Sequence, residues 1–380
     1  MASSSLRIGL IGVEHRARIA ENWQKDGRAK IVAGADIVDA FLDQFRTQYG
    51  KNEPFVTKDY RELIARDDVD AVGVFTPDYL HAEPAIAALR AGKHVYCEKP
   101  MAIRIADCDA MIEAAKQSGK HLMVGMNMRY MDGFLTLKQI MESGQLGAIK
   151  AIWVRHFVGF GGWAYFHDYR ANAEKSTGLL LQKASHDFDM IHFLSGRYTQ
   201  RVVGMGSLDF FGGDKPDDLT CENCAEKQTC TDFSTRERKT QCCFRKGVNV
   251  EDHSMVLMNL GDLRACYMQC HYACETTRNY LVIGTDGQAE FTGNAIHVKT
   301  QKANSTKARA RASFATAAYD IGASSGGHSG ADPRICKAFL DLVLDGKPAL
   351  STAEAGRMAV AVGCCATDSI RRGNVAVDIP

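Results

Sequence analysis

Short apolar runs alternate with longer amphipathic stretches along the first third of the chain. The apolar runs have the length of strands, and the amphipathic stretches have the length and period of helices. Strands are predicted at 7–12, 30–36, 71–75, 94–97 and 121–124, and helices at 17–25, 38–49, 59–66, 81–90 and 106–118. This order indicates a parallel sheet with helices on both faces, a Rossmann-like doubly wound α/β fold.

The pattern changes in the last third of the chain. Residues 254–300 alternate with a period of two and contain the turn sequences Gly261–Asp262 and Gly284–Gly287, which predicts antiparallel strands. Residues 303–325 are rich in Ala, Ser, Lys and Arg and predict a mobile surface segment. Amphipathic helices are predicted at 334–345 and 352–371.

The length of the chain favours two domains, because single hydrophobic cores stop growing at roughly 250 to 300 residues. The 380 residues carry 46 basic and 45 acidic side chains, so neither nucleic acid nor an anionic membrane is an expected partner. No signal-like segment opens the chain, and no apolar run approaches the roughly 18 residues of a membrane helix. We expect a cytoplasmic protein with domains at 1–125 and 126–380, the helices at 334–371 packing back on the first.

The first predicted strand ends in a glycine, Gly12, which suits the tight turn that places a helix start against a pyrophosphate. The rest of the G-x-G-x-x-G pattern is altered, because Glu14 and Ala17 occupy the second and third glycine positions. Glu14 brings bulk and negative charge to the place where phosphate would approach. His15 and Arg16 follow it, and Arg16 can offset that charge by pairing with phosphate or with Glu14.

Asp36 ends the second predicted strand, about twenty residues after the loop, where a carboxylate accepts hydrogen bonds from the ribose of adenosine. Ile37 follows it instead of an arginine, so a 2′-phosphate would meet a negative charge without a cationic partner. The pair favours NAD over NADP.

A lysine closes the strand at 94–97. In Glu98-Lys99-Pro100, the proline restricts Lys99 to an extended backbone at a strand end, which is where open parallel sheets bind ligands. Lys99 is therefore a candidate for chemistry.

The chain resembles the oxidoreductases related to glucose-fructose oxidoreductase and inositol dehydrogenase, the Gfo/Idh/MocA family. The resemblance covers nearly the whole chain in order, and Glu-Lys-Pro after Ala-Gly-Lys-His-Val is its most specific part. The matching segments are 8–12, 76–81, 91–95, 98–100, 127–130, 185–189, 284–287 and 328–332.

The resemblance implies a Rossmann-like domain followed by an α/β domain with a large, open, mostly antiparallel sheet. One face of that sheet covers cofactor and substrate, and the other commonly forms a dimer or tetramer contact, so we expect a homodimer or homotetramer. By analogy, Asn127 and Arg129 lie at the domain junction. The residues expected near the cofactor are Thr76, Pro77, His81, Glu98, Lys99 and Asn127.

Oxidation of a secondary alcohol needs a group that removes the hydroxyl proton. Family members carry an aspartate four residues before the histidine that corresponds to His186, whereas this chain has Gln182. Glutamine cannot take a proton, so either His186 is the base alone or Lys183 shares the work, its pKa lowered by burial or by oxidised nicotinamide. We assign Lys99 as proton relay and hydroxyl orienter, His186 as acid or base, and Lys183 and Gln182 as substrate contacts.

Aromatic side chains with polar tips gather between residues 153 and 172, a composition that suits a sugar pocket as well as an aromatic core. Arg129, Arg170 and Lys183 together hint at an acidic sugar. The predicted pocket residues are Trp163, Tyr165, His167 and Arg170.

Five cysteines lie close together in a polar stretch and offer four thiolates to a structural zinc ion, although their spacing is not that of a standard zinc ribbon. Unligated thiols and a disulfide stay open as alternatives. The four ligands would be Cys221, Cys224, Cys230 and either Cys242 or Cys243.

Three functions are compatible with these residues. The first is an NAD-dependent dehydrogenase or reductase acting on a hydroxyl of a sugar or cyclitol. The second is an NAD-dependent glycoside hydrolase that works by transient oxidation, elimination, water addition and reduction. The third is a cofactor-sensing protein without catalysis, for which Glu14 is the best argument and Lys99 with His186 the best counterargument.

Overall fold

The computed structural model describes residues 5–159, 161–236, 238–301, 314–322 and 326–380. The chain divides into two compact units, residues 1–132 with 324–360 and residues 133–323 with 361–380. Among the described residues, no helix has the length and apolar character needed to span a bilayer.

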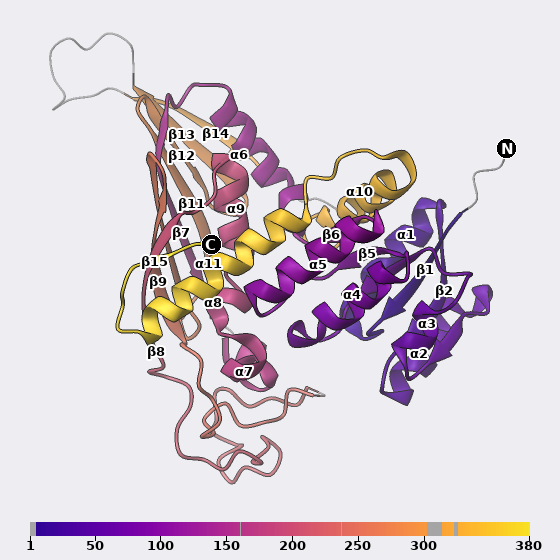
Figure 1. Ribbon diagram of the computed structural model, residues 1–380. Helices are drawn as coiled ribbons and strands as arrows, with labels where there is room; N and C mark the ends of the chain where they lie inside the picture. Colours follow the sequence, from indigo (N-terminus) through magenta and orange to yellow (C-terminus); the bar gives the residue numbers. More distant parts are fainter. Residues whose placement is uncertain (1–4, 160, 237, 302–313, 323–325) are drawn as a thin grey trace, which may run out of the picture. The chain divides into compact units, whose positions relative to one another are not determined.

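The first unit is built on a six-stranded parallel sheet (Figure 1). Its strand order is β3-β2-β1-β4-β5-β6, the order of a dinucleotide-binding fold. The strands are β1 (Leu6–Ile11), β2 (Ala29–Ala35), β3 (Phe55–Thr57), β4 (Ala71–Val74), β5 (His94–Cys97) and β6 (Leu122–Val124). The helices are α1 (Glu21–Asp26), α2 (Asp39–Tyr49), α3 (Tyr60–Ile64), α4 (Ala82–Arg90), α5 (Ile105–Ser118) and α10 (Ala331–Asp345).

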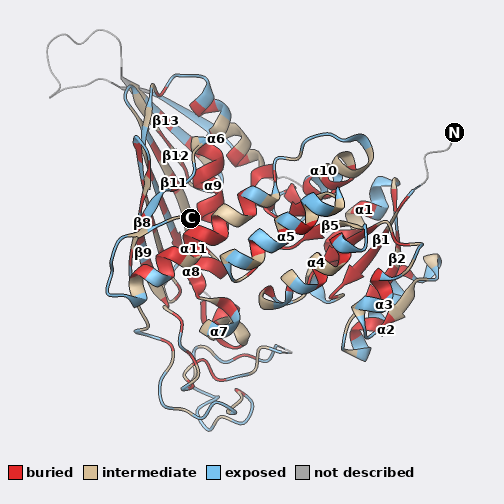
Figure 2. Cartoon of the chain, viewed as in Figure 1, coloured by how far each residue is buried: buried red, intermediate tan, exposed pale blue. Residues whose placement is uncertain are grey.

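The central strands β4 and β5 are buried along nearly their whole length, because helices cover both faces of the sheet (Figure 2). The short edge strand β3 is absent from the sequence prediction, since three residues are too few to show a period. Helix α10 joins the core from the far end of the chain: the ring centroids of Trp23 and Phe339 lie 5.4 Å apart, and Trp23 Nε1 donates to the carbonyl of Cys336 at 3.1 Å.

The second unit is built on a nine-stranded, mostly antiparallel sheet with strand order β14-β13-β12-β11-β7-β10-β9-β8-β15. Only the pair β7 and β10 is parallel. The strands are β7 (Ile149–Phe157), β8 (Arg201–Ser207), β9 (His253–Leu260), β10 (Leu263–Cys270), β11 (Thr277–Gly284), β12 (Gly287–Phe291), β13 (Ala295–Gln301), β14 (Phe314–Asp320) and β15 (Val377–Asp378). The helices are α6 (Asp132–Glu142), α7 (Ala173–Ser176), α8 (Leu179–Gln182), α9 (Ser185–Ser195) and the second part of α11 (Ala353–Arg371), which passes from the first unit into the second.

Helices cover one face of this sheet, so its strands alternate between buried and exposed residues. Phe134 of α6 meets Tyr280 and Phe291 edge-on, and Phe188 of α9 meets Tyr267. The predicted turns at Gly261–Asp262 and Gly284–Gly287 are confirmed as the β9–β10 and β11–β12 hairpins.

One prediction for the last third needs correction. The segment 303–325 was expected to be mobile throughout, but residues 314–320 form strand β14, which pairs with β13 over its whole length. Its backbone ladder stabilises it in spite of the weak apolar pattern. Residues 302–313 and 323–325 lie outside the described part of the chain.

Candidate active site

The turn after β1 depends on Gly12. Its φ is 78°, and a Cβ placed there would lie 2.8 Å from the backbone of Phe75 and Thr76, so only glycine fits. The chain then enters a 3₁₀ helix at His15–Ala20 and becomes α-helical only at Glu21. The helix predicted from Ala17 therefore has a 3₁₀ first part, which keeps the loop close to the ends of β1 and β4.

The carboxylate of Asp36 supports this loop from the end of β2. One oxygen accepts the backbone N–H of Val13 and the other accepts that of Val38, both at 3.0 Å. Ile37, the next residue, is 81% exposed, so the strand end is open to solvent. The sequence predicted that the carboxylate of Asp36 acts at this strand end as a hydrogen-bond acceptor for the ribose. The structure adds that the same carboxylate orders the loop.

These residues fit the adenosine side of a dinucleotide. Asp36 holds acceptor oxygens at the strand end beside the Gly12 turn, where ribose hydroxyls bind in this fold. The negative charge there also disfavours a 2′-phosphate. Glu14 and His15 have exposed side chains in the same loop.

A buried histidine links two neighbouring strand ends. The Nδ1 atom of His81 lies 2.7 Å from the carbonyl oxygen of Pro100, and its Nε2 lies 2.8 Å from that of Thr76. The imidazole thus ties the loop after β4 to the loop after β5. His81 and Thr76 were predicted near the cofactor, and in the structure they brace the backbone beside Lys99.

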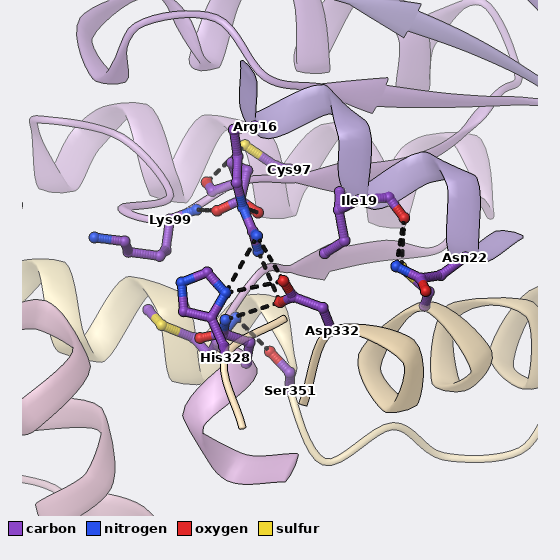
Figure 3. Close-up of polar contacts among 12 residues, drawn as sticks. Arg16, Ile19, Asn22, Cys97, Lys99, His328, Asp332 and Ser351 are labelled. Atoms are coloured by element: carbon purple, nitrogen blue, oxygen red, sulfur yellow. Dashed lines mark hydrogen bonds and ion pairs between the residues drawn. The ribbon is translucent and has the colours of Figure 1, made fainter. Parts of the chain in front are cut away.

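Glu98 and Lys99 directly follow strand β5. One oxygen of Glu98 accepts the backbone N–H of Lys99 at 3.0 Å, and the other accepts Arg16 Nε at 2.6 Å. Arg16 also contacts both oxygens of Asp332, at 3.0 and 3.3 Å. Figure 3 shows Arg16 and Asp332 pointing toward each other, while the Lys99 side chain extends away from them.

Asp332 has further partners in the first unit. Asn127 Nδ2 donates to it at 3.1 Å, and His328 Nδ1 lies 2.9 Å from it. Burial acts to raise the pKa of Asp332, but hydrogen bonds from His328 and Arg16 hold that pKa well below its ordinary value. The carboxylates of Glu98 and Asp332 thus belong to one network of charges, and each has a cationic or hydrogen-bonding partner.

A second charged cluster lies in the second unit around the buried Asp187. Its carboxylate accepts hydrogen bonds from His156 Nδ1 at 3.0 Å, Arg278 Nε at 2.8 Å and the hydroxyl of Tyr280. Burial acts to raise the pKa of Asp187, but the charge of Arg278 and the hydrogen bond from His156 hold it well below its ordinary value. Burial and the charge of Arg278 in turn lower the pKa of His156 to about 4, so this imidazole is neutral at pH 7.

Lys183 lies beside this cluster. Burial and the charge of Arg278 lower the pKa of Lys183 to about 8, against the opposing effect of Asp187. Its Nζ is 5.7 Å from the ring centroid of Tyr165, and Tyr165 meets the buried His271 edge-on at 5.1 Å. Among the described residues, neither ring nitrogen of His271 has a hydrogen-bond partner. Buried polar atoms of this kind suit a ligand hydroxyl or a water.

Gln182 and His186, the residues assigned to the substrate hydroxyl and its proton, come from two consecutive helices. Gln182 ends α8, His186 is the second residue of α9, and the buried Asp189 follows one turn later. Asp189 lies three positions after His186 on this helix, so both lie on the same side of one turn. Their roles, like those of Lys99 and Lys183, stay predictions.

The other predicted pocket residues have partners of their own in the structure. The guanidinium carbon of Arg236 lies 3.9 Å from the ring centroid of Trp163. His167 Nδ1 lies 2.5 Å from the carbonyl oxygen of Gln241. Arg170 pairs with Asp168 at 2.5 Å, and Arg129 donates to the carbonyl of Leu350 at 2.6 Å within the first unit. Tyr165 lies beside Lys183, as described above. The expectation of an acidic sugar contacted by Arg129, Arg170 and Lys183 stays a prediction.

The cysteine cluster offers no metal centre. In the described ranges, no group of three or more His, Cys, Asp or Glu side chains is placed to hold a metal ion, and all the cysteines are free thiols. Cys221 Sγ lies 3.6 Å from Nδ1 of His167, the residue that follows a π-helical turn at Gly162–Phe166. The prediction of a structural zinc ion at Cys221, Cys224, Cys230 and Cys242 or Cys243 finds no support, which leaves the alternative of unligated thiols.

Sequence reasoning missed the partners of Asp187. His156, Arg278 and Tyr280 lie at positions that face the helices, on strands whose other residues on that face are apolar. The available signal was a polar residue at a position that the alternation along the strand predicts to be buried. Asp332 and His328 belong to a matching segment, but nothing local indicates that they meet Arg16.

Two family descriptions cover most of the chain. The NAD-binding Rossmann fold of the oxidoreductase family GFO_IDH_MocA matches residues 6–126, and the C-terminal alpha/beta domain of that family matches residues 138–379. The inositol 2-dehydrogenase of Salmonella typhimurium is 33% identical over 192 residues, 49% of this chain and 52% of that protein. The myo-inositol 2-dehydrogenase of Thermotoga maritima is 33% identical over 204 residues, 53% and 59% of the two chains. The chain thus spans little more than half the length of these relatives.

Solved structures agree over the whole fold. Levoglucosan dehydrogenase in complex with NADH and levoglucosan superposes with a TM-score of 0.78 at 20% identity, covering 99% of this chain and 100% of that one. An oxidoreductase domain protein from Kribbella flavida gives 0.78 at 21% identity, with coverage of 99% and 100%. With a parallel dinucleotide-type sheet, a large antiparallel sheet and both family domains in order, the chain belongs to the Gfo/Idh/MocA family of oxidoreductases.

Proposed function

We propose that the protein is an NAD-dependent dehydrogenase or reductase that acts on a secondary hydroxyl of a sugar or cyclitol. The relatives named for inositol and levoglucosan support this substrate class. NAD, when bound, supplies the hydride acceptor for the carbinol carbon. The chain itself must bind the polyol, orient the hydroxyl and take its proton.

We assign these tasks to three residues. His186 takes the hydroxyl proton, Lys99 orients the hydroxyl and relays the proton, and Lys183 contacts the substrate and shares the role of base. Gln182 stands where family members carry an aspartate, so it can hold a hydroxyl by hydrogen bonds but cannot accept a proton.

The observation that carries the proposal is the position of Lys183, whose Nζ lies 5.7 Å from the ring centroid of Tyr165, with the buried His271 edge-on to that ring. A pKa of about 8 lies close to neutral pH, so this lysine can give up and take back a proton readily there. Burial and Arg278 produce that shift within the second unit, so the cluster is suited to acid–base work. A protein that only senses a cofactor has no need of such a group.

The decisive experiment follows two products at once. Purified protein is incubated with NAD and a panel of free sugars, cyclitols and nitrophenyl glycosides while NADH and nitrophenol are recorded. A rise of NADH with a free polyol supports the proposal. Release of nitrophenol that requires NAD but leaves no net NADH would instead assign the glycoside hydrolase. If neither product forms, the cofactor-sensing protein is the remaining function.

Replacing Asp36 with asparagine is expected to weaken NAD binding roughly tenfold to a hundredfold, because hydrogen bonds to a charged group contribute about 1.5 to 3 kcal/mol. The relative affinity for NADP should rise, since the repelling charge is gone. Both dissociation constants are measured by quenching of protein fluorescence. Asp39→Asn is the matched control, because Asp39 lies three residues on and pairs only at the surface with Lys58. An unchanged NAD affinity in Asp36→Asn would contradict the assignment.

We also propose that the protein forms a homodimer or homotetramer through the outer face of the large sheet. Trp153, Cys266 and Leu257 are neighbours across three strands and share that face, and Trp153 and Leu257 are 50% and 63% exposed. Met205 and Met255 extend the apolar patch over β8 and β9. An apolar patch of this kind on a sheet is typical of an interface between proteins.

Leu257→Glu is expected to shift the protein toward monomer, raising the concentration of half-dissociation about tenfold or more, because a charge would be buried in an apolar contact. Light scattering coupled to size-exclusion chromatography measures the change. Ile37→Glu places the same charge at an apolar residue of the first unit that is 81% exposed, and it should leave the mass unchanged. Wild-type protein that runs as a monomer at all concentrations would refute the proposal.

A further inference from the structure

Arg16 occupies the position in the dinucleotide loop from which an arginine would be expected to reach phosphate. Its guanidinium instead contacts two carboxylates of its own unit, Glu98 at 2.6 Å and Asp332 at 3.0 and 3.3 Å (Figure 3). The two carboxylate side chains are 8% and 9% exposed, and that of Arg16 is 31% exposed. Three of the five guanidinium donors are thus used within the protein.

The contact with Glu98 leads directly to Lys99. The Glu98 oxygen that Arg16 does not hold accepts the backbone N–H of Lys99 at 3.0 Å. The backbone N–H of Glu98 donates to Val74 of the neighbouring strand at 3.0 Å. Hydrogen bonds therefore fix both the backbone and the side chain of Glu98. Together they set the position of the Lys99 backbone.

Charge explains why the position needs a cation. Two carboxylates, those of Glu98 and Asp332, lie around Arg16, and without it they would be buried near each other with no cation between them. Asp332 has Asn127 and His328 as further partners, so the contact between Arg16 and Glu98 is the part of the network that reaches Lys99.

We propose that Arg16 is a positioning residue for Lys99: it holds Glu98 in the orientation that fixes the Lys99 backbone, and it does not serve as a phosphate ligand. This inference rests on the proposed function only for the role of Lys99. The lysine side chain extends away from the ion pairs, so Arg16 acts on it through Glu98 (Figure 3).

The test compares Arg16→Gln and Arg16→Lys with the matched control Arg28→Gln. Arg28 is 33% exposed and also pairs with carboxylates, those of Asp26 at 2.6 Å, Asp341 of α10 at 2.8 Å and Asp345 at 3.5 Å. Within the described part of the chain, it has no ion pair with Glu98. Three quantities are measured: the NAD dissociation constant by fluorescence quenching, amide hydrogen exchange at Lys99, and kcat with the polyol that wild type oxidises.

Arg16→Gln should exchange the Lys99 amide at least about tenfold faster and lower kcat about tenfold to a hundredfold, because misplacement of a reacting group by about 1 Å costs that much. NAD affinity should change less than about threefold, and Arg16→Lys should recover part of both losses, since one ammonium can still hold Glu98. Arg28→Gln should leave exchange at Lys99 and kcat as in wild type.

The opposite pattern overturns the inference. If Arg16→Gln weakens NAD binding more than about tenfold while exchange at Lys99 is unchanged, Arg16 is a phosphate ligand. If Arg16→Gln does not fold, Arg16→Lys decides. One ammonium cannot hold both carboxylates as the guanidinium does, so its Lys99 amide should still exchange about threefold faster than in wild type, and an unchanged rate contradicts the role. If wild type binds NAD but oxidises no polyol, the proposed function fails, while the binding and exchange measurements still judge Arg16.

Discussion

Replacing His186 with glutamine is expected to lower kcat by about 10² to 10⁴, the contribution of a positioned general base. Glutamine keeps a polar side chain of similar size on α9 but cannot take a proton. The NAD dissociation constant should stay within about threefold of wild type, because the role assigned to His186 is with the substrate hydroxyl and not with the nucleotide. Steady-state kinetics with the polyol found in the substrate panel, together with fluorescence titration of NAD, measure both quantities.

His192→Gln is the control for this prediction. His192 lies on the same helix, is buried, and its Nε2 is 2.8 Å from Thr199 Oγ1. Its loss should lower the free energy of unfolding by about 1 to 3 kcal/mol, since a buried hydrogen bond is removed, and leave kcat unchanged at a temperature where the protein is folded. If His186→Gln behaves like His192→Gln, His186 is a structural histidine and the role of base passes to Lys183.

Lys183→Met is expected to remove an alkaline rise in kcat/KM. A lysine acts as base only when neutral, and with a pKa of about 8 the neutral fraction grows from roughly one tenth at pH 7 to roughly nine tenths at pH 9. Wild-type kcat/KM should therefore rise roughly tenfold over this interval, and the variant should show a flat profile at a lower value. Lys183→Arg keeps a cation that does not lose its proton, so it should also lack the rise.

The same shift has a consequence for stability, and its sign is opposite to that of an ordinary ion pair. The unfolded lysine has a pKa near 10.4 and binds more protons than the folded one between about pH 8 and 10.4, so the free energy of unfolding should increase with pH in that window. Denaturant titrations at pH 7.5 and 9.5 measure the change, and Lys183→Met should lose it. A wild-type profile without an alkaline rise, together with no stability increase, would show that Lys183 keeps an ordinary pKa.

Local sequence was sufficient for most of the first unit. Its strands and helices lie within one to three residues of the predicted ranges, because continuous apolar runs and amphipathic helices are both short-range signals. The exceptions are the edge strand β3 and the 3₁₀ start of the first helix, which are too short to show a period. The hairpins of the second unit were predictable from their glycine-containing turns, whereas β14 was missed because its ladder with β13 stabilises a sequence of weak pattern.

By itself, then, the sequence determined the alternation of strands and helices, the family, and the placement of Gly12, Asp36, Lys99 and His186 at strand ends and helix starts. The tertiary structure alone decided the partners of the charged residues. Arg16 meets Asp332 across 316 positions of the chain, and Asp187 meets Arg278 across 91. Periodicity and turn residues act over a few neighbours, but an ion pair forms between whichever opposite charges the folded chain brings within about 4 Å, so no local pattern could identify these contacts.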